Sequence, residues 1–218
     1  MVSWLRRVRV RLCVMNMIYR VVAVNVAKGP TIMLASGKLF DFLDPHGSDF
    51  DIEDIAHGLA HVCRYAGQCR AFYSVAEHSM LVADTVSEFA FEALLHDAAE
   101  AFIGDVTRPF KQLLPDYKRI EATIEDAMIV RFDLDRGSRD LVKHADLRVL
   151  AAEQAQVMAA GCSDWAVGAG IQPAPIVVRC LDPVSAKREF LLRYESYRHE
   201  RQEASKRSAN TGAPSSWL

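Results

Sequence analysis

Three ionisable residues interrupt an apolar segment near the middle of the chain, and this run constrains the fold more than any other feature. The run reads Ala93-Leu94-Leu95-His96-Asp97-Ala98-Ala99-Glu100. On a helix, Glu100 shares a face with His96 and Asp97, because residues three and four apart are neighbours. Burying an unpaired neutral polar group costs roughly 2–7 kcal/mol, and burying a charge costs more. The run therefore predicts a compensating partner, and a metal ion is the obvious one.

The composition is that of a globular protein with a large core. Of the 218 residues 50% are hydrophobic and 25% are charged, and the net charge is −2. This length suits one domain or two small ones, and a nearly neutral chain has no overall attraction to nucleic acid or to an anionic membrane. No stretch reaches the roughly 20 apolar residues of a membrane-spanning helix. We therefore expect a cytoplasmic protein with neither a membrane partner nor a stable nucleic-acid partner.

The two ends of the chain differ from the part between them. Residues 1–20 carry several arginines before a short apolar run that is broken by Asn16, without the cleavage site of a signal peptide. We treat residues 1–20 as an extension outside the fold and expect residues 201–218, which are polar and rich in serine, to be disordered. The domain is expected to span residues 21–200. Its cysteines are scattered without the spacing of a zinc site, which predicts reduced and mostly buried thiols.

The pattern of apolar residues predicts a mostly helical domain. A valine-rich strand at 21–27 and a small hairpin at 31–34 and 39–42 precede helices at 51–65, 74–89, 92–103, 116–132, 139–160 and 183–199, with a short extended piece at 176–178. Ser74 and Glu77 have the spacing of a capping box, and Ser138 precedes a helix as a cap. Gly104 is a natural residue to follow a helix, and Asp182-Pro183 to begin one. The expected fold class is all-α with a small N-terminal β-hairpin.

Four potential metal ligands lie on three of these expected helices: His78, His96, Asp97 and Asp146. Two imidazoles with two carboxylates suit a divalent ion such as Mn, Co, Fe, Zn or Mg. Glu100, one turn beyond the His-Asp pair, is placed to position or deprotonate a water. Taken singly, a His-Asp pair also fits a solvated helix face, and Asp146 also fits a surface or capping carboxylate. His57 and His61 have a metal-binding spacing as well, but we interpret them as structural.

The set as a whole resembles a known superfamily. The segments Ser74–Ser79, Leu94–Glu100, Gly104-Asp105 and Ala145-Asp146 are similar to the H…HD…D signature of the HD-domain metal-dependent phosphohydrolases. Within that superfamily the chain most resembles the 5′-deoxynucleotidase-like branch, through Phe40–Pro45, Asp51–Ala56 and Cys63–Tyr65. The resemblance covers roughly residues 30–195. It implies an HD-domain helical bundle.

The resemblance also implies roles for single residues. His78, His96, Asp97 and Asp146 would bind the metal, and Glu100, with Asp97, would be catalytic. Arg64 would contact the phosphate, Tyr65 would lie beside the sugar, and Asp105 would accept a hydrogen bond from a sugar hydroxyl. Arg108 or Lys111 could add positive charge at the mouth of the site. The structural alternatives are that Arg64 pairs with a carboxylate and that Arg108 is solvated.

These roles predict a metal-dependent phosphohydrolase that removes phosphate from a (deoxy)nucleotide, as a 5′-(deoxy)nucleotidase does. One alternative keeps the metal site but releases triphosphate or pyrophosphate from a deoxynucleoside triphosphate. Another is a metal- and nucleotide-binding helical module without turnover, which would have no need of Glu100 as a proton-transfer group. A homodimer or a larger homo-oligomer is common among relatives of this branch and stays open here.

Overall fold

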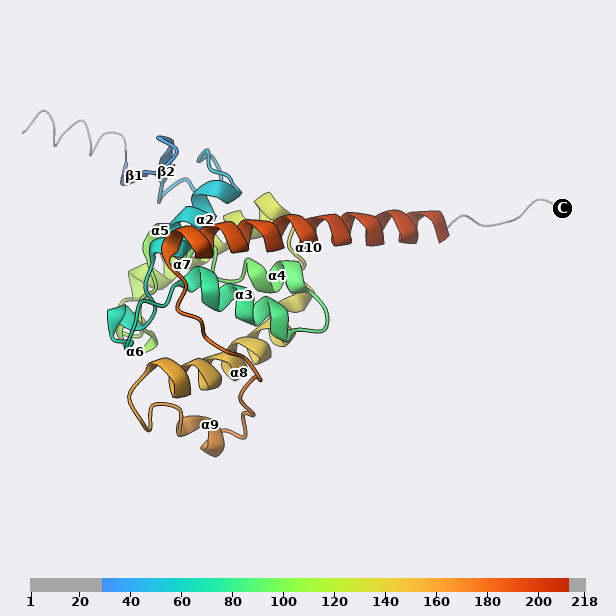
Figure 1. Ribbon diagram of the computed structural model, residues 1–218. Helices are drawn as coiled ribbons and strands as arrows, with labels where there is room; N and C mark the ends of the chain where they lie inside the picture. The colour runs from blue at the N-terminus through green and yellow to red at the C-terminus, as the bar shows by residue number, and fades with distance from the viewer. Residues whose placement is uncertain (1–28, 212–218) are drawn as a thin grey trace, which may run out of the picture. The chain divides into compact units, whose positions relative to one another are not determined.

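Figure 1 shows the computed structural model of the chain, which describes residues 29–211. The expected extension at 1–20 and strand at 21–27 lie outside the described residues. The chain divides between Phe50 and Asp51 into two compact units. Each unit is described by itself below.

The first unit contains the expected hairpin. Strands β1 (Thr31–Met33) and β2 (Leu39–Asp41) pair antiparallel, with Ile32 opposite Phe40. The Phe40 ring meets Phe42 and Phe50 edge-on at centroid distances of 5.6 and 5.5 Å. Such edge-to-face pairs add to the burial of their apolar area, so this unit has an aromatic cluster of its own.

The second unit is helical, which confirms the expected fold class of a mostly helical protein with a small hairpin. Its elements are α2 (Ile52–His61), the 3₁₀ helix η1 (Tyr65–Gly67), α3 (Val75–Thr85), α4 (Ala90–Leu94), α5 (Glu100–Ile103), α6 (Arg108–Lys111), α7 (Pro115–Phe132), the 3₁₀ helix η2 (Arg136–Ser138), α8 (Arg139–Val157), α9 (Trp165–Gly168) and α10 (Pro183–Thr211).

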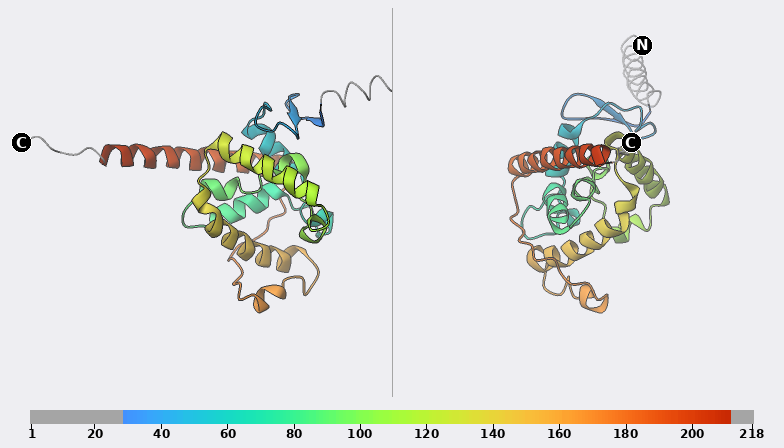
Figure 2. Two further views of the ribbon diagram at one scale, coloured as in Figure 1. Left: turned by 180° about the vertical axis from the view of Figure 1, so that it is seen from behind. Right: turned by 90° about the vertical axis from the view of Figure 1, so that its right-hand side faces the viewer.

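Helix α3 occupies the centre of this unit. It contacts α2, α4, α8 and α10, and eight of its eleven residues are buried. The first half of α10 lies along α2, α3 and α4, and α8 covers another side of α3 (Figures 1 and 2). Among the described helices, none is long and apolar enough to cross a membrane.

Close packing of α2 against α5 depends on Gly58. A Cβ atom at this position would lie 2.6 Å from the carbonyl oxygen of Ala101 and 2.8 Å from its Cβ. Glycine therefore allows α2 to approach the short helix that begins with Glu100. Helix α2 itself begins with a capping box formed by Asp51 and Asp54.

The expected capping box at the start of α3 is only half formed. The Ser74 hydroxyl accepts the Glu77 backbone N–H at 3.2 Å, but the Glu77 side chain does not return to Ser74. Its two carboxylate oxygens accept the backbone N–H groups of Arg179 and Leu181 at 2.6 and 2.8 Å. The carboxylate is needed there because the extended segment before α10 has no ladder of its own.

Other differences from the expected elements also have local causes. Helix α2 ends at His61 because Val62 is extended and Cys63 pairs with Ser74 in an isolated bridge. Helix α3 ends at Thr85, and Phe89 adopts a left-handed conformation with φ of 61°. The Ser138 hydroxyl donates to the Asp135 carbonyl and leaves the start of α8 without a side-chain cap.

Two segments near the end of the chain differ as well. Residues 176–178 form no strand, and Val178 instead donates its backbone N–H to the Gln156 side chain. We expected disorder from residue 201, but α10 continues to Thr211. The Arg201 side chain donates to the Phe132 carbonyl at 3.2 Å and lies over the Phe91 ring, which fixes the helix beyond its expected end.

The four cysteines of the described part are free thiols, as expected, but they are half-buried rather than buried. The Sγ atoms of Cys63 and Cys69 lie 3.6 Å apart. This proximity arises from the turn around η1, where three consecutive residues have positive φ.

Candidate metal centre

The expected helix at 92–103 is interrupted at the His-Asp pair itself. Helix α4 ends at Leu94 and α5 begins at Glu100, and a turn lies between them. In this turn Ala98 donates to Leu95 and Glu100 donates to Asp97, at 3.0 and 2.9 Å, so the spacing is that of a 3₁₀ helix. The i, i+4 geometry that we assumed for His96 and Glu100 is therefore wrong, although both side chains remain in the site.

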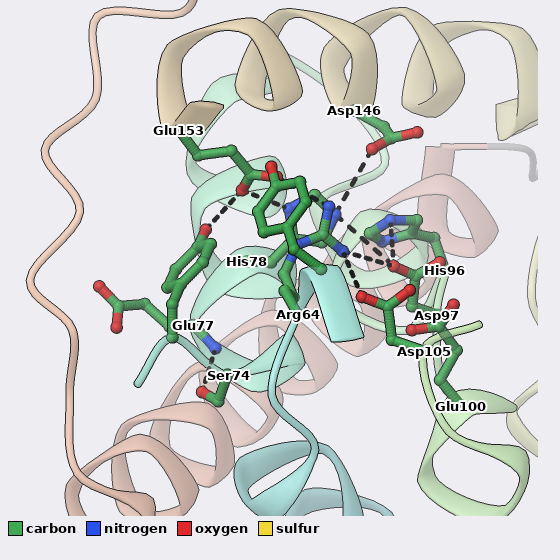
Figure 3. Close-up of polar contacts among 12 residues, drawn as sticks. Arg64, Ser74, Glu77, His78, His96, Asp97, Glu100, Asp105, Asp146 and Glu153 are labelled. Atoms are coloured by element: carbon green, nitrogen blue, oxygen red, sulfur yellow. Dashed lines mark hydrogen bonds and ion pairs between the residues drawn. The ribbon is translucent and has the colours of Figure 1, made fainter. Parts of the chain in front are cut away.

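Three of the four predicted ligands converge from separate elements. His78 on α3, His96 in the turn after α4 and Asp146 on α8 offer ligand atoms that all lie within 4.8 Å of one another. Figure 3 shows these side chains pointing toward a common point. His78 is fully buried and the other two are partly buried. The group could hold a metal ion.

The two histidine rings are oriented by their outer nitrogens. Nδ1 of His78 is 3.0 Å from a Glu153 carboxylate oxygen, and Nδ1 of His96 is 2.7 Å from the Ala93 carbonyl oxygen. The Nε2 atoms of both rings are buried without a hydrogen-bond partner. Metal-binding histidines commonly donate one nitrogen to a carboxylate or carbonyl and present the other to the ion, so the donor set fits a metal.

One distance inside the group agrees with that interpretation. Ligand atoms about 2.1 Å from a common ion are about 3.0–3.4 Å apart in octahedral or tetrahedral geometry. Nε2 of His78 lies 3.4 Å from an Asp146 oxygen. The fourth predicted ligand, Asp97, stands outside the group of three, but its Oδ2 lies 3.2 Å from Nε2 of His96 and 3.5 Å from Nε2 of His78.

Carboxylates outnumber cations around the group. Burial would raise the pKa of Asp97, but His96 and then His78 outweigh burial and hold that pKa well below its usual range. Asp146 behaves alike: burial opposes a pKa decrease that His78 and His96 cause. The acidic residues of this region are Asp97, Glu100, Asp105, Asp146 and Glu153, against the cations Arg64, Lys111 and Lys143. This excess of negative charge favours a bound cation.

Glu100 lies beside the ligand group without belonging to it. One carboxylate oxygen is 3.5 Å from the Lys111 ammonium, and the other is buried without a hydrogen-bond partner. Burial, followed by the charges of Asp97 and Asp105, raises the pKa of Glu100 well above its usual range. A carboxyl group with a raised pKa is suited to general acid–base catalysis.

Sequence reasoning missed Glu153, which is fully buried on α8. Its carboxylate accepts from Arg64 at 2.7 Å and from the hydroxyls of Tyr65 and Tyr73 at 2.6 Å, besides its contact with His78. Burial would raise the pKa of Glu153, but Arg64 and His78 outweigh it and lower that pKa to about 2. The available signal was its position seven residues after Asp146, which places both on one face of a helix.

The predicted substrate residues fall into two groups. The Arg64 guanidinium is buried, and besides Glu153 its Nη1 lies 3.8 Å from Asp97 and 4.0 Å from Asp105. Arg64 thus pairs with a carboxylate, as the structural alternative predicted, and this pair lies within the site. The Tyr65 hydroxyl is already bound to Glu153. Arg108 is exposed at the start of α6 and has none of these contacts.

A cavity of about 680 Å³ adjoins the ligands. His96, Asp97 and Asp146 form part of its wall. Apolar side chains and charged side chains, many of them from α7 and α8, form the rest, among them Met128, Ile129, Val142, Glu125, Arg139 and Lys143. A molecule in this cavity would therefore have both an apolar surface and the ligand group within reach.

Two curated bacterial proteins resemble this chain over most of their own length. The chain is 44% identical over 137 residues to uncharacterized protein YfdR of Escherichia coli (strain K12), an alignment that covers 62% of this chain and 77% of YfdR. It is 36% identical over 165 residues to uncharacterized protein RCAP_rcc00048 of Rhodobacter capsulatus, covering 68% of this chain and 83% of that protein.

A scan against protein-family models matches none of them to the chain. Identities of 44% and 36% over more than three quarters of both relatives are nevertheless sufficient to establish common descent. The chain belongs to the protein family that contains YfdR and RCAP_rcc00048.

Proposed function

We propose that this protein is a metal-dependent phosphohydrolase that removes phosphate from a (deoxy)nucleotide. The observation that carries the proposal is the paired orientation of His78 and His96. Each presents an unpartnered Nε2 toward Asp146, and each has its Nδ1 engaged by a fixed acceptor. The resemblance of the same residues to the HD-domain signature supports this reading.

His78, His96 and Asp146 would hold the ion, with Asp97 beside them. The donor set of imidazole and carboxylate suits Mn, Co, Fe, Zn or Mg. A bound divalent ion lowers the pKa of water and polarises a phosphoryl oxygen.

Residues of the chain supply the remaining functions. The oxygen of Glu100 that has no hydrogen-bond partner is placed to take a proton from the attacking water. The water oxygen bonds to phosphorus at the same time. The P–O bond to the leaving group then breaks, and that group receives the proton that Glu100 accepted from the water. Nη1 of Arg64 lies beyond hydrogen-bond distance of Asp97 and Asp105, so it keeps donor capacity for a phosphate oxygen.

The cavity supports a substrate with an uncharged part attached to the phosphate. Its volume of about 680 Å³ falls within the range of small-molecule sites, which is about 300–1,000 Å³. Its apolar residues suit a nucleobase, and its carboxylates can accept hydrogen bonds from sugar hydroxyls or base N–H groups.

Two alternatives use the same metal site. Release of triphosphate or pyrophosphate would require hydrolysis of a P–O bond farther from the terminal phosphorus of the nucleotide. A binding module without turnover would leave the buried, unpartnered oxygen of Glu100 without a role, which is costly for a purely structural carboxylate. That atom favours catalysis over binding alone.

The test is a hydrolysis panel. Protein stripped of metal and reloaded separately with Mn, Co, Mg or Zn is incubated with nucleoside mono-, di- and triphosphates, in ribo and deoxy forms. We expect inorganic phosphate from at least one monophosphate with at least one metal. Pyrophosphate or triphosphate as the product would move the assignment to the first alternative. Nucleotide binding without any product under all metals would contradict the hydrolase.

A further inference from the structure

Glu153 is a buried carboxylate with four donors around it, and no role has yet been assigned to it. Its side chain is 0% exposed, although an isolated buried charge is among the most unfavourable groups in a protein interior. The four donors come from η1 and the segment before it, from the segment before α3, and from α3 itself. They are Arg64, Tyr65, Tyr73 and His78.

The two oxygens of this carboxylate divide the donors into two pairs. Oε1 accepts from Arg64 Nη2 and the Tyr65 hydroxyl, and Oε2 accepts from the Tyr73 hydroxyl and lies 3.0 Å from Nδ1 of His78. Figure 3 shows the Glu153 carboxylate beside the His78 ring, with the Arg64 side chain nearby. One carboxylate therefore contacts a ligand of the candidate metal centre through one oxygen and the arginine beside that centre through the other.

We propose that Glu153 is the positioning residue of the metal centre: it fixes the proton of His78 on Nδ1 and so presents Nε2 to the ion. This inference rests on the proposed metal site but not on the identity of the substrate. The carboxylate only accepts, so Nδ1 of His78 donates, and in the neutral ring that binds a metal Nε2 then keeps its lone pair. The bond to Tyr73 holds Oε2 in place for that contact.

Glu153→Gln is the most informative substitution. It keeps the shape of the side chain but replaces one of the two acceptor oxygens with an NH₂ donor. Arg64 only donates, so the amide oxygen of glutamine must face Arg64 and its NH₂ group must face His78. Nδ1 of His78 would then accept, its proton would move to Nε2, and the lone pair for the ion would be lost. Changes in such outer partners weaken metal binding by about 10–100-fold.

The experiment measures metal affinity by calorimetry with Zn and the visible spectrum of the Co-loaded protein. Glu77→Gln is the matched control, since Glu77 is also a buried glutamate, and its carboxylate binds the backbone of Arg179 and Leu181. We expect Glu153→Gln to bind metal about 10–100-fold more weakly and to alter the Co spectrum. Glu77→Gln should alter neither.

Two tyrosines provide a finer pair of variants. Tyr73→Phe removes a donor from the oxygen that faces His78, and Tyr65→Phe removes one from the oxygen that faces Arg64. Only Tyr73→Phe should weaken metal binding, by less than Glu153→Gln does. Equal effects of the two variants, or a folded Glu153→Gln with wild-type metal affinity, would overturn the role.

A measurement on the unaltered protein decides the matter if Glu153→Gln does not fold. Ring ¹⁵N shifts of His78 in the Zn-loaded chain should show the proton on Nδ1; a proton on Nε2, or absence of metal binding, would refute the inference. Absence of phosphate release with the metal-binding pattern intact would contradict only the proposed function.

Discussion

Glu77 and His78 are neighbours on α3, yet their side chains point into two regions that differ in how their buried polar groups are hydrogen-bonded. Glu77 faces the segment before α10, where both oxygens accept backbone N–H groups and the carboxylate is satisfied. His78 faces the candidate metal centre, where Nε2 is buried without a hydrogen-bond partner. Buried polar groups in proteins are almost always hydrogen-bonded. The contrast is between a satisfied carboxylate that joins two segments of the fold and a buried nitrogen that could bind a metal ion.

The largest expected effect is on the metal side of this contrast. His96→Ala removes one of the two imidazoles from the group, so we expect loss of tightly bound metal and of all measurable hydrolysis. Elemental analysis of purified protein and a phosphate-release assay measure both. The exposed His61→Ala on α2 is the control and should match wild type. Hydrolysis that persists in His96→Ala would place the chemistry elsewhere.

A second variant separates catalysis from metal binding. Glu100→Gln removes a proton acceptor but none of the three converging ligands. We expect kcat to fall by about 10²–10⁴-fold while the metal content stays at the wild-type level. Steady-state kinetics with elemental analysis of the same preparation provide the test. Loss of metal from this variant would instead make Glu100 a ligand or a support of the ligands.

On the structural side, Glu77→Ala should destabilise without affecting the centre. Removing the carboxylate leaves the N–H groups of Arg179 and Leu181 without acceptors, at a cost of about 1–3 kcal/mol for each group that stays buried. Urea unfolding of the metal-free variant measures the change in the free energy of unfolding. A loss of metal affinity in the folded variant would show that the two regions are not independent.

The smallest expected effect concerns a helix end far from the ligands in sequence. Asp51→Ala removes the oxygen that accepts the N–H groups of Glu53 and Asp54 at the start of α2. Such cap losses cost about 1 kcal/mol of stability. Thermal unfolding should show a small decrease in Tm with unchanged metal binding. A stability equal to wild type would mean that water replaces the cap.

The sequence by itself determined the helical fold class, the hairpin and three residues that could hold a metal ion. Apolar periodicity predicts helices because each must bury one face, and ionisable residues such as His96 and Asp97 within an apolar run indicate a compensated site. Local pattern also placed the start of α10 at Asp182-Pro183, where the carboxylate accepts two backbone N–H groups. The helices, the hairpin and this helix start depend on contacts within a few residues.

Only the tertiary structure decided which partners the polar side chains bind in the folded chain. Periodicity predicts one helix through His96 and Asp97, but the chain tightens into a 3₁₀ turn there. The spacing of Ser74 and Glu77 fits a capping box, yet Glu77 binds a segment about one hundred residues later. Glu153 gave no motif, because its four partners come together only when α8 packs against α3. Contacts between residues distant in sequence leave no periodic trace, so they become visible only in the folded chain.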